Sequence, residues 1–206
     1  AQARHRPTLG RDTNTSRNQE KCGLAQRAET LTQMRIDLYQ PDIPQNTGTI
    51  LRLCACLKVE AHIIEPAGFP VSDRHFRRAG MDYLDQVSLC RHSSWTAFEN
   101  WRRAEGLRLL LFTTAATMSY LDHSYRRDDV LMFGRESAGV PDAVHRAADA
   151  RLLLPLRPAL RPINVAMAAA LAVGEALKQT GRLSTLVPPA PPPPRPPPRP
   201  PLIHSR

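Results

Sequence analysis

The chain has 206 residues, of which 42% are hydrophobic, and it carries a formal net charge of +9. These values are typical of one folded domain with a sizeable core, and they exclude a chain that is disordered throughout. No apolar stretch reaches the roughly 18 residues that span a bilayer. The N-terminus lacks the apolar segment of a secretory signal, so we expect a cytoplasmic protein with no membrane partner.

The positive charge lies mainly at the two ends of the chain. Residues 1–34 and 185–206 each carry a net +3, and the much longer segment 35–184 carries the remaining +3. A basic protein often has a polyanionic partner. Basic tails are more often solvated segments than nucleic-acid arms, however, so the charge permits an RNA partner without establishing one.

Composition divides the chain into three parts. Residues 1–34 are polar, show no sustained periodicity and are predicted to be disordered. Residues 185–206 are a proline-rich tail, also predicted to be disordered, with eleven prolines between 188 and 201. Such a run favours polyproline II, either as a spacer without a partner or as a ligand for an aromatic groove of the SH3 kind. Residues 35–184 remain as the folded domain.

Short apolar runs alternate with helical patterns from residue 35 onward. The later runs are almost continuously apolar, as expected for central strands covered on both faces. This alternation predicts an α/β domain with a mostly parallel sheet flanked by helices. Strands are predicted at 36–39, 61–65, within 82–90, at 107–113, 129–133 and 151–156, and helices from 46 or 47 to 57, from 72 or 73 to 79, and at 94–104, 141–148 and 162–180.

The first predicted helix carries one oddly placed cation. Its apolar residues share a single stripe, and Arg52 lies off that stripe. An arginine in this position is usually an ordinary surface residue. Asn46, at the start of the same helix, either caps the helix or supports an active site.

The cysteines and the helical aromatic residues are interpreted as structural. Cys54 and Cys56 are two positions apart in a predicted helix, so their thiols point in different directions and cannot share a metal. The seven histidines show no metal-ligand spacing either, and we expect no metal. Trp95, Phe98 and Trp101 share one helix face, where core or dimer packing is favoured over base stacking.

Several common sites are missing from the sequence. There is no G-x-G-x-x-G after the first predicted strand, no G-x-x-x-x-G-K-[ST] and no G-x-S-x-G. Loops follow three of the apolar strands instead, at 111–114, 133–136 and 154–156. Ligands of open α/β sheets bind beyond the carboxyl ends of the strands. Gly134 lies in such a loop, where it serves either a tight turn or the close approach of backbone to a ligand.

Three motifs stand in a recognisable order. They read N-x-G-x-x-x-R at 46–52, F-G-x-E-x-x-G-V-P at 133–141 and R-x-x-N-V at 161–165. Together they resemble the motifs of the SPOUT (SpoU-TrmD) RNA methyltransferases. The similarity is closest to the small TrmL type, which methylates the ribose 2'-hydroxyl of the wobble nucleotide of tRNA, and it runs from about residue 34 to 181.

The resemblance implies a fold, a cofactor and a site. It implies an α/β sheet with a deep C-terminal trefoil knot, a homodimer, S-adenosylmethionine as the cofactor, and the anticodon stem-loop of tRNA as the partner. Arg52 takes the position of the catalytic arginine. Residues carried over to the cofactor pocket are Phe112, Gly134, Leu154, Pro162, Leu156 and Ile163, and those carried over to active-site support are Asn46, Glu136 and Asn164.

The implied chemistry suits these residue types. A ribose 2'-hydroxyl is a weak nucleophile that must lose a proton while it attacks a sulfonium methyl group. Arginine is normally fully charged, so Arg52 either orients the hydroxyl and stabilises developing negative charge or acts as a base after local deprotonation. The sulfonium is already activated, so the reaction needs no metal.

Two positions depart from the family pattern. Pro162 stands where the third motif usually has serine, and Ala138 stands where the second motif often has arginine. Proline removes a hydroxyl and a backbone N–H but suits the first turn of a helix. Glu136 could also be a solvated loop acid without a role in the site.

Three alternatives to a tRNA methyltransferase remain open from the sequence. The same fold could methylate the 2'-hydroxyl of ribosomal RNA. It could instead be a knotted RNA-binding protein whose activity has decayed, as Pro162 and Ala138 suggest, although Arg52 and Asn164 argue against this. The chain could also be an interaction module that works through its polyproline tail.

Overall fold

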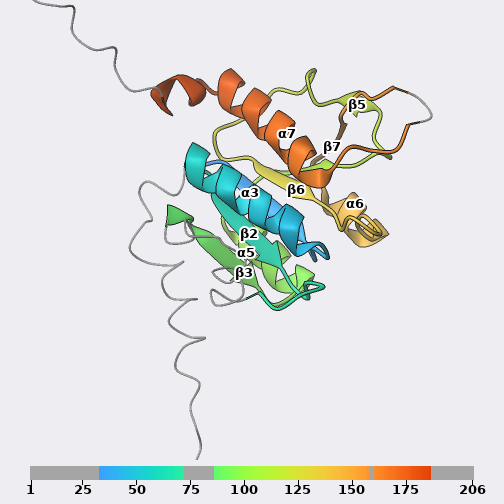
Figure 1. The fold of residues 1–206 in the computed structure, drawn as a ribbon. Helices are drawn as coiled ribbons and strands as arrows, with labels where there is room; N and C mark the ends of the chain where they lie inside the picture. Colours follow the sequence, from blue (N-terminus) through green and yellow to red (C-terminus); the bar gives the residue numbers. More distant parts are fainter. Residues whose placement is uncertain (1–32, 72–85, 158–159, 187–206) are drawn as a thin grey trace, which may run out of the picture.

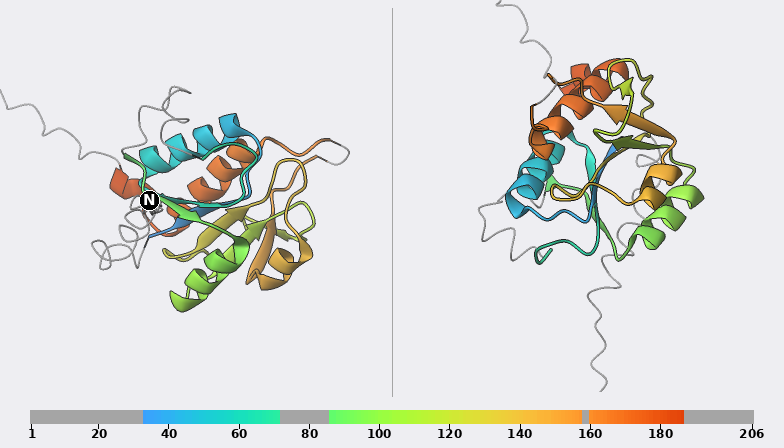
Figure 2. Two further views of the ribbon diagram at one scale, coloured as in Figure 1. Left: turned by 90° about the horizontal axis from the view of Figure 1, so that it is seen from below. Right: turned by 90° about the vertical axis from the view of Figure 1, so that its right-hand side faces the viewer.

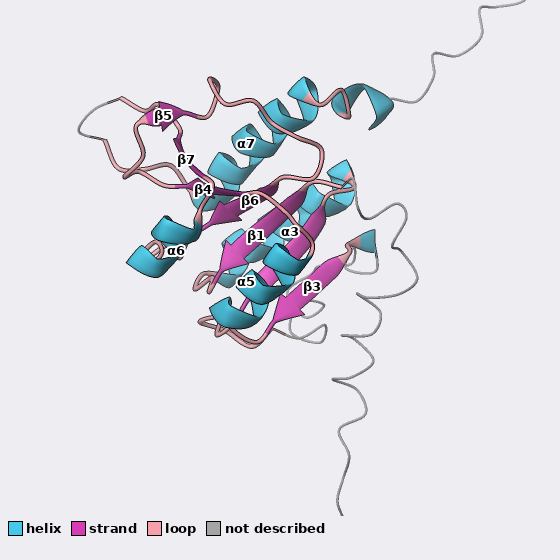
Figure 3. Cartoon of the chain, turned by 180° about the vertical axis from the view of Figure 1, so that it is seen from behind, coloured by secondary structure: helices cyan, strands magenta, loops and turns pink. Residues whose placement is uncertain are grey.

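The computed structural model describes residues 33–71, 86–157 and 160–186. Within these ranges, parallel strands form one seven-stranded sheet in the order β3-β2-β1-β6-β4-β7-β5. Figure 1 and Figure 2 show α3 and α7 side by side on one face, and Figure 3 shows α5 and α6 on the opposite face. The strands are β1 (Arg35–Tyr39), β2 (Glu60–Ile64), β3 (Leu89–His92), β4 (Leu109–Phe112), β5 (Met118–Ser119), β6 (Val130–Phe133) and β7 (Ala150–Leu153), and the helices are α3 (Pro44–Leu57), α5 (Trp95–Ala104), α6 (Asp142–Ala147), α7 (Val165–Gln179) and the 3₁₀ helix η2 (Leu183–Leu186).

The prediction of a parallel α/β sheet flanked by helices is confirmed. The strand predicted within 82–90 begins only at Leu89, and the two-residue strand β5 was missed because it is too short to show a periodicity. The helix predicted to end at 79 lies outside the described residues. The trefoil knot remains a prediction.

Alternating side chains give the sheet a core on each face. Leu110 of β4 and Leu131 of β6 belong to the core beneath α3 and α7, and Leu109 and Val130 belong to the core beneath α5 and α6. The aromatic face of α5 packs into the second core, where Phe98 is fully buried. The expectation that this face serves packing is therefore confirmed for Trp95, Phe98 and Trp101.

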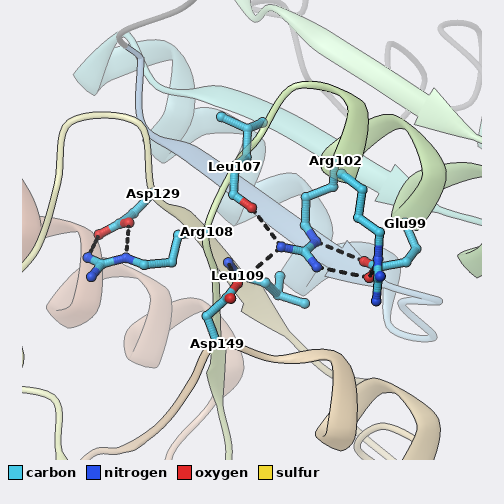
Figure 4. A network of polar contacts seen from close by, with 8 residues as sticks. Glu99, Arg102, Leu107, Arg108, Leu109, Asp129 and Asp149 are labelled. Atoms are coloured by element: carbon cyan, nitrogen blue, oxygen red, sulfur yellow. Dashed lines mark hydrogen bonds and ion pairs between the residues drawn. The ribbon is translucent and has the colours of Figure 1, made fainter.

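Charged side chains join the amino ends of β4 and β6 to α5, as Figure 4 shows. Arg102, which is 5% exposed, donates to Glu99 at 2.8 Å and to Asp149 at 3.1 Å. Arg108 donates to both oxygens of the buried Asp129 carboxylate, at 2.8 and 2.7 Å. These pairs stabilise the amino ends of the strands. The loops that carry the sequence motifs lie at the opposite, carboxyl ends.

No helix within the described ranges is both long enough and apolar enough to cross a membrane. Of the two predicted tails, residues 1–32 and 187–206 lie outside the described residues. The helix η2 extends the folded part to Leu186, slightly beyond the domain end predicted at residue 184.

Candidate active site

The helix α3 begins at Pro44, two or three residues before the start predicted at 46 or 47. Pro44 occupies its first turn and Ile43 is the N-cap residue, with no side-chain capping hydrogen bond. Proline is suited to this position because its missing N–H has no helical partner there. Asn46 therefore does not cap the helix, and the capping interpretation is wrong. Its Nδ2 instead donates to Oε1 of Glu136 at 3.0 Å.

Asn164 connects the third motif to the first. It is the N-cap of α7, where its Oδ1 accepts a hydrogen bond from the Ala166 backbone N–H at 2.7 Å. Its Nδ2 donates to Oδ1 of Asn46 at 2.7 Å. One hydrogen-bonded chain thus joins Asn164, Asn46 and Glu136, so each of the three motifs contributes a side chain to the cluster.

Asp42 belongs to this cluster although the sequence interpretation left it out. The backbone N–H of Asp42 donates to Glu136 Oε2, and the backbone N–H of Glu136 donates to Asp42 Oδ1, each at 3.2 Å. The Ser137 hydroxyl also donates to the Asp42 carboxylate. Its position in the sequence could have indicated this role, because Asp42 lies in the loop after β1. That loop is at the same end of the sheet as the loop after β6.

The two carboxyl groups of this pair have opposite pKa shifts. Hydrogen bonds from Glu136 and Ser137 lower the pKa of Asp42 to about 2. Burial raises the pKa of Glu136, and its hydrogen bonding with Asp42 raises it further. Glu136 is half-buried and accepts two hydrogen bonds, so the solvated-acid interpretation does not fit its surroundings.

Gly134 and Gly139 are required by the geometry of the second-motif loop. A Cβ placed on Gly134 would lie 2.7 Å from the backbone carbon of Gly139. Arg135 and Gly139 exchange backbone hydrogen bonds of 2.9 and 2.8 Å, and Gly139 has a φ of 65°. The tight turn alone is therefore sufficient to explain a glycine at position 134, because the loop leaves no space there for a side chain.

Apolar residues lie at the same edge, at the ends of β4 and β7. Phe112 stacks on Phe133 with ring centroids 4.9 Å apart. Leu154 and Ile163 are half-buried, and Leu156 is 42% exposed. Exposed apolar surface beside a polar cluster fits S-adenosylmethionine, whose adenine ring is apolar on its faces and whose methionine end is polar.

Arg52 lies on the exposed side of α3, as predicted. The opposite side of this helix is buried in the core beneath α3 and α7, which fixes the direction of the arginine side chain. The structure therefore places Arg52 on the same helix as Asn46, whose side chain belongs to the hydrogen-bonded cluster with Glu136 and Asn164.

Pro162 differs from expectation. It is exposed and lies two residues before the N-cap of α7, so it is not in the first turn of that helix. The helix begins later than predicted because Asn164 caps it. Ala138, the second departure from the family pattern, is exposed in the turn between Arg135 and Gly139.

Comparisons with known proteins agree with this arrangement. The family model described as "SpoU rRNA Methylase family" matches residues 33–174. A protein of Beijerinckia indica named tRNA (cytidine(34)-2'-O)-methyltransferase is 66% identical over 150 residues, which cover 73% of this chain and 94% of that protein. The family match therefore covers most of the described residues.

Two solved structures share the fold. One, described as "Structural insights into the 2-OH methylation of C/U34 on tRNA", has a TM-score of 0.67 and 36% identity and covers 72% of this chain and 97% of its own. The other, an AdoMet-bound rRNA methyltransferase of Sinorhizobium meliloti, has a TM-score of 0.64 and 25% identity and covers 71% of this chain and 56% of its own. The fold and the three-motif cluster define the class as the SPOUT RNA methyltransferases. Within that class, the chain belongs to the SpoU rRNA methylase family.

Proposed function

We propose that this protein transfers a methyl group from S-adenosylmethionine to the ribose 2'-hydroxyl of the wobble nucleotide of tRNA. The observation that carries the proposal is the hydrogen-bonded chain from Asn164 through Asn46 to Glu136, which joins all three motifs at the carboxyl edge of the sheet. The relative from Beijerinckia indica, whose name gives cytidine 34 of tRNA as its target, supports tRNA as the substrate and the wobble position as the site. The AdoMet-bound neighbour supports the cofactor.

The residues at the sheet edge divide into an apolar and a polar group. Leu154, Leu156 and Ile163 would hold the adenine part of the cofactor, and the loop at Gly134 would face its polar part. S-adenosylmethionine supplies a methyl group on a positively charged sulfur, which is activated for attack by an oxygen nucleophile. Asn46 and Asn164 hold the loops in register, so the chain's own contribution is orientation.

Arg52 is proposed to act on the ribose. A guanidinium carries five N–H donors and remains charged at neutral pH, so it can hold the RNA phosphate and stabilise negative charge on the attacking 2'-oxygen. S-adenosylmethionine would supply the methyl group and leave as S-adenosylhomocysteine, and the hydroxyl proton would pass to solvent. Arg52 does not need to accept that proton in this role. Its place on the exposed side of α3 supports contact with a large external substrate.

A homodimer is proposed to complete the site, with Arg52 of one protomer close to the cofactor of its partner. Exposed apolar side chains on α7 support a contact surface, because Met167 is 61% and Leu171 48% exposed. Large apolar side chains grouped on one helix often mark an interaction site. We also propose that the fold contains a deep C-terminal trefoil knot and that the protein works in the cytoplasm.

Labelled S-adenosylmethionine tests the proposal. The full chain is incubated with the cofactor and either total tRNA or ribosomal RNA, and the labelled methyl group is followed. Transfer to tRNA is the expected result. Transfer to ribosomal RNA would replace the proposed substrate and leave the reaction intact, whereas no transfer together with no cofactor binding in a calorimetric titration would support a protein whose activity has decayed.

A further inference from the structure

The face of the sheet beneath α5 contains charged side chains where an apolar core is expected. Arg35, Asp37, Glu60 and His62 all point to this face, and their exposed fractions are 3, 0, 5 and 0%. The parallel register of β1 and β2 pairs Arg35 with Glu60 and Asp37 with His62. Removing charges from water costs several kcal/mol per ion unless a partner compensates. Each group in this cluster therefore needs a partner.

The compensation is incomplete at Asp37. Arg35 Nε donates to Glu60 Oε2 at 3.0 Å, so these two charges are paired. Neither oxygen of the Asp37 carboxylate has a hydrogen-bond partner within the described part of the chain. The imidazole of His62 faces this carboxylate, with Nδ1 3.8 Å from Asp37 Oδ1, which is too far for a hydrogen bond. A fully buried carboxylate in this state favours a cation beside it.

His62, which faces this carboxylate, lies together with two other side chains that can bind a metal. The register of β2 and β3 sets Cys90 beside His62 and His92 beside Ile64. One donor atom each of His62, Cys90 and His92 lies within 4.8 Å of the other two, and His62 Nδ1 is 2.9 Å from His92 Nε2. Both histidines are at least 93% buried by the covering residues, among which the Trp101 ring lies 4.7 Å from His62 and 5.1 Å from His92.

We propose that His62, Cys90 and His92 form a binding site for one divalent transition-metal ion of the zinc class. Two imidazoles and one thiolate are ligands that Zn²⁺ prefers, and three protein ligands leave one position of a tetrahedral ion for water or a further group. The site is separate from the three-motif cluster, since it lies on strands β2 and β3 and not in the loops after β1, β6 and β7.

The surroundings of His62 fit this role. Its Nε2 lies 3.5 Å from Glu60 Oε1, so a proton on Nε2 faces a carboxylate and leaves the lone pair of Nδ1 for the metal. Arg35 holds Glu60 in place. Carboxylate–histidine–metal arrangements of this kind orient the ligand and increase its basicity.

The charge balance also fits. A metal–sulfur bond forms at Cys90 as the thiol proton leaves to solvent, which makes the cysteine a thiolate. The two positive charges of the ion are then partly balanced by this thiolate, and the Glu60 carboxylate lies 3.5 Å from the other ring nitrogen of His62. The ion would join β2 to the edge strand β3, so the expected role is to stabilise that edge of the sheet.

Cobalt binding tests the site directly. The untagged full chain is stripped with a chelator and titrated with Co²⁺, and thiolate-to-cobalt charge-transfer absorption is recorded. We expect one equivalent per chain, displacement by Zn²⁺, and loss of the band in Cys90→Ser. The matched control is Cys56→Ser on the exposed side of α3, which should keep the band. Glu60→Gln should weaken binding by about 10- to 100-fold, the usual effect of removing an outer partner.

Failure of the unaltered chain to bind cobalt at micromolar concentration would overturn the proposal and leave a direct His62–His92 hydrogen bond in its place. So would a band that persists in Cys90→Ser. If the variants do not fold, X-ray absorption of the zinc-loaded unaltered chain decides the question: one sulfur and two imidazole nitrogens are expected, and a shell without sulfur contradicts the site. None of these readouts depends on methyl transfer.

Discussion

The side-chain amide of Asn164 donates to the side-chain oxygen of Asn46 across 2.7 Å. The two residues are 118 positions apart in the chain, and this contact joins the start of α7 to the first turns of α3. Asn164 also caps α7 with its other side-chain atom. One residue therefore has a stabilising role and a positioning role, and the two can be separated by substitution.

The substitution Asn164→Ser should separate the stabilising role of Asn164 from its positioning role. Serine is as good an N-cap as asparagine, but its hydroxyl is too short to reach Asn46. We expect nearly unchanged stability and a loss of roughly tenfold in kcat/KM, which is the size of one hydrogen bond of about 1.4 kcal/mol. Asn164→Ala, which removes the cap as well, should lose about 1 kcal/mol of unfolding free energy. Equal activity of Asn164→Ser and the unaltered protein would refute the positioning role.

Asp42 should contribute to stability in a pH-dependent way. Its pKa is lowered to about 2 in the folded protein from a usual value of 3.8, so the folded state favours the ionised carboxylate. This contribution is present above about pH 4 and is lost as pH falls toward 2. Thermal unfolding of the unaltered protein and of Asp42→Asn should differ at pH 6, and the difference should shrink as pH falls from about 4 toward 2. A difference that stays constant over this range would contradict the assignment.

The two cysteines of α3 should differ strongly in reactivity. Burial raises the pKa of Cys54 to about 12, whereas Cys56 is exposed. Because the thiolate is the reactive form, iodoacetamide at pH 8 should modify Cys56 in the native protein and spare Cys54. Peptide mass spectrometry after brief labelling measures the difference. Equal labelling of Cys54 and Cys56 in the native state would contradict the assignment of Cys54 to the buried face of α3.

Gly134→Ala should destabilise the loop after β6. The added Cβ would lie 2.7 Å from the backbone of Gly139, which cannot move without breaking the hairpin, so a loss of about 1–3 kcal/mol is expected. Gly174→Ala in α7 is the matched control, because nothing lies within 4 Å of its Cβ. That change should stabilise by about 0.5–1 kcal/mol. Chemical denaturation measures the free energy of unfolding of both variants. Similar values for Gly134→Ala and Gly174→Ala would contradict the tight packing at Gly134.

Much of this structure could be predicted from the sequence. The near-continuous apolar runs identified β4 and β6, because central strands buried on both faces need apolar residues at every position. Motif order identified the family, which the comparisons confirm. Element type was predictable in these places because local pattern and tertiary environment agree.

Other features depended on contacts between distant parts of the chain. Asn46 was an equally good cap or site residue in the sequence, and only its hydrogen bond to Glu136 decides between them. The cluster of His62, Cys90 and His92 has no recognisable spacing, because neighbouring parallel strands bring it together. Pro162 was placed inside a helix that begins three residues later, at Val165, because Asn164 provides the cap.

The central claim is methyl transfer to the wobble ribose, and mapping the modified nucleotide tests it most directly. Unmodified tRNA is incubated with the full chain and S-adenosylmethionine, then digested and analysed by mass spectrometry, with Arg52→Ala in parallel. We expect a 2'-O-methyl group at nucleotide 34, the position in the name of the relative from Beijerinckia indica, and little product with Arg52→Ala. A methyl group on a base or at another nucleotide, or full activity without Arg52, would contradict it.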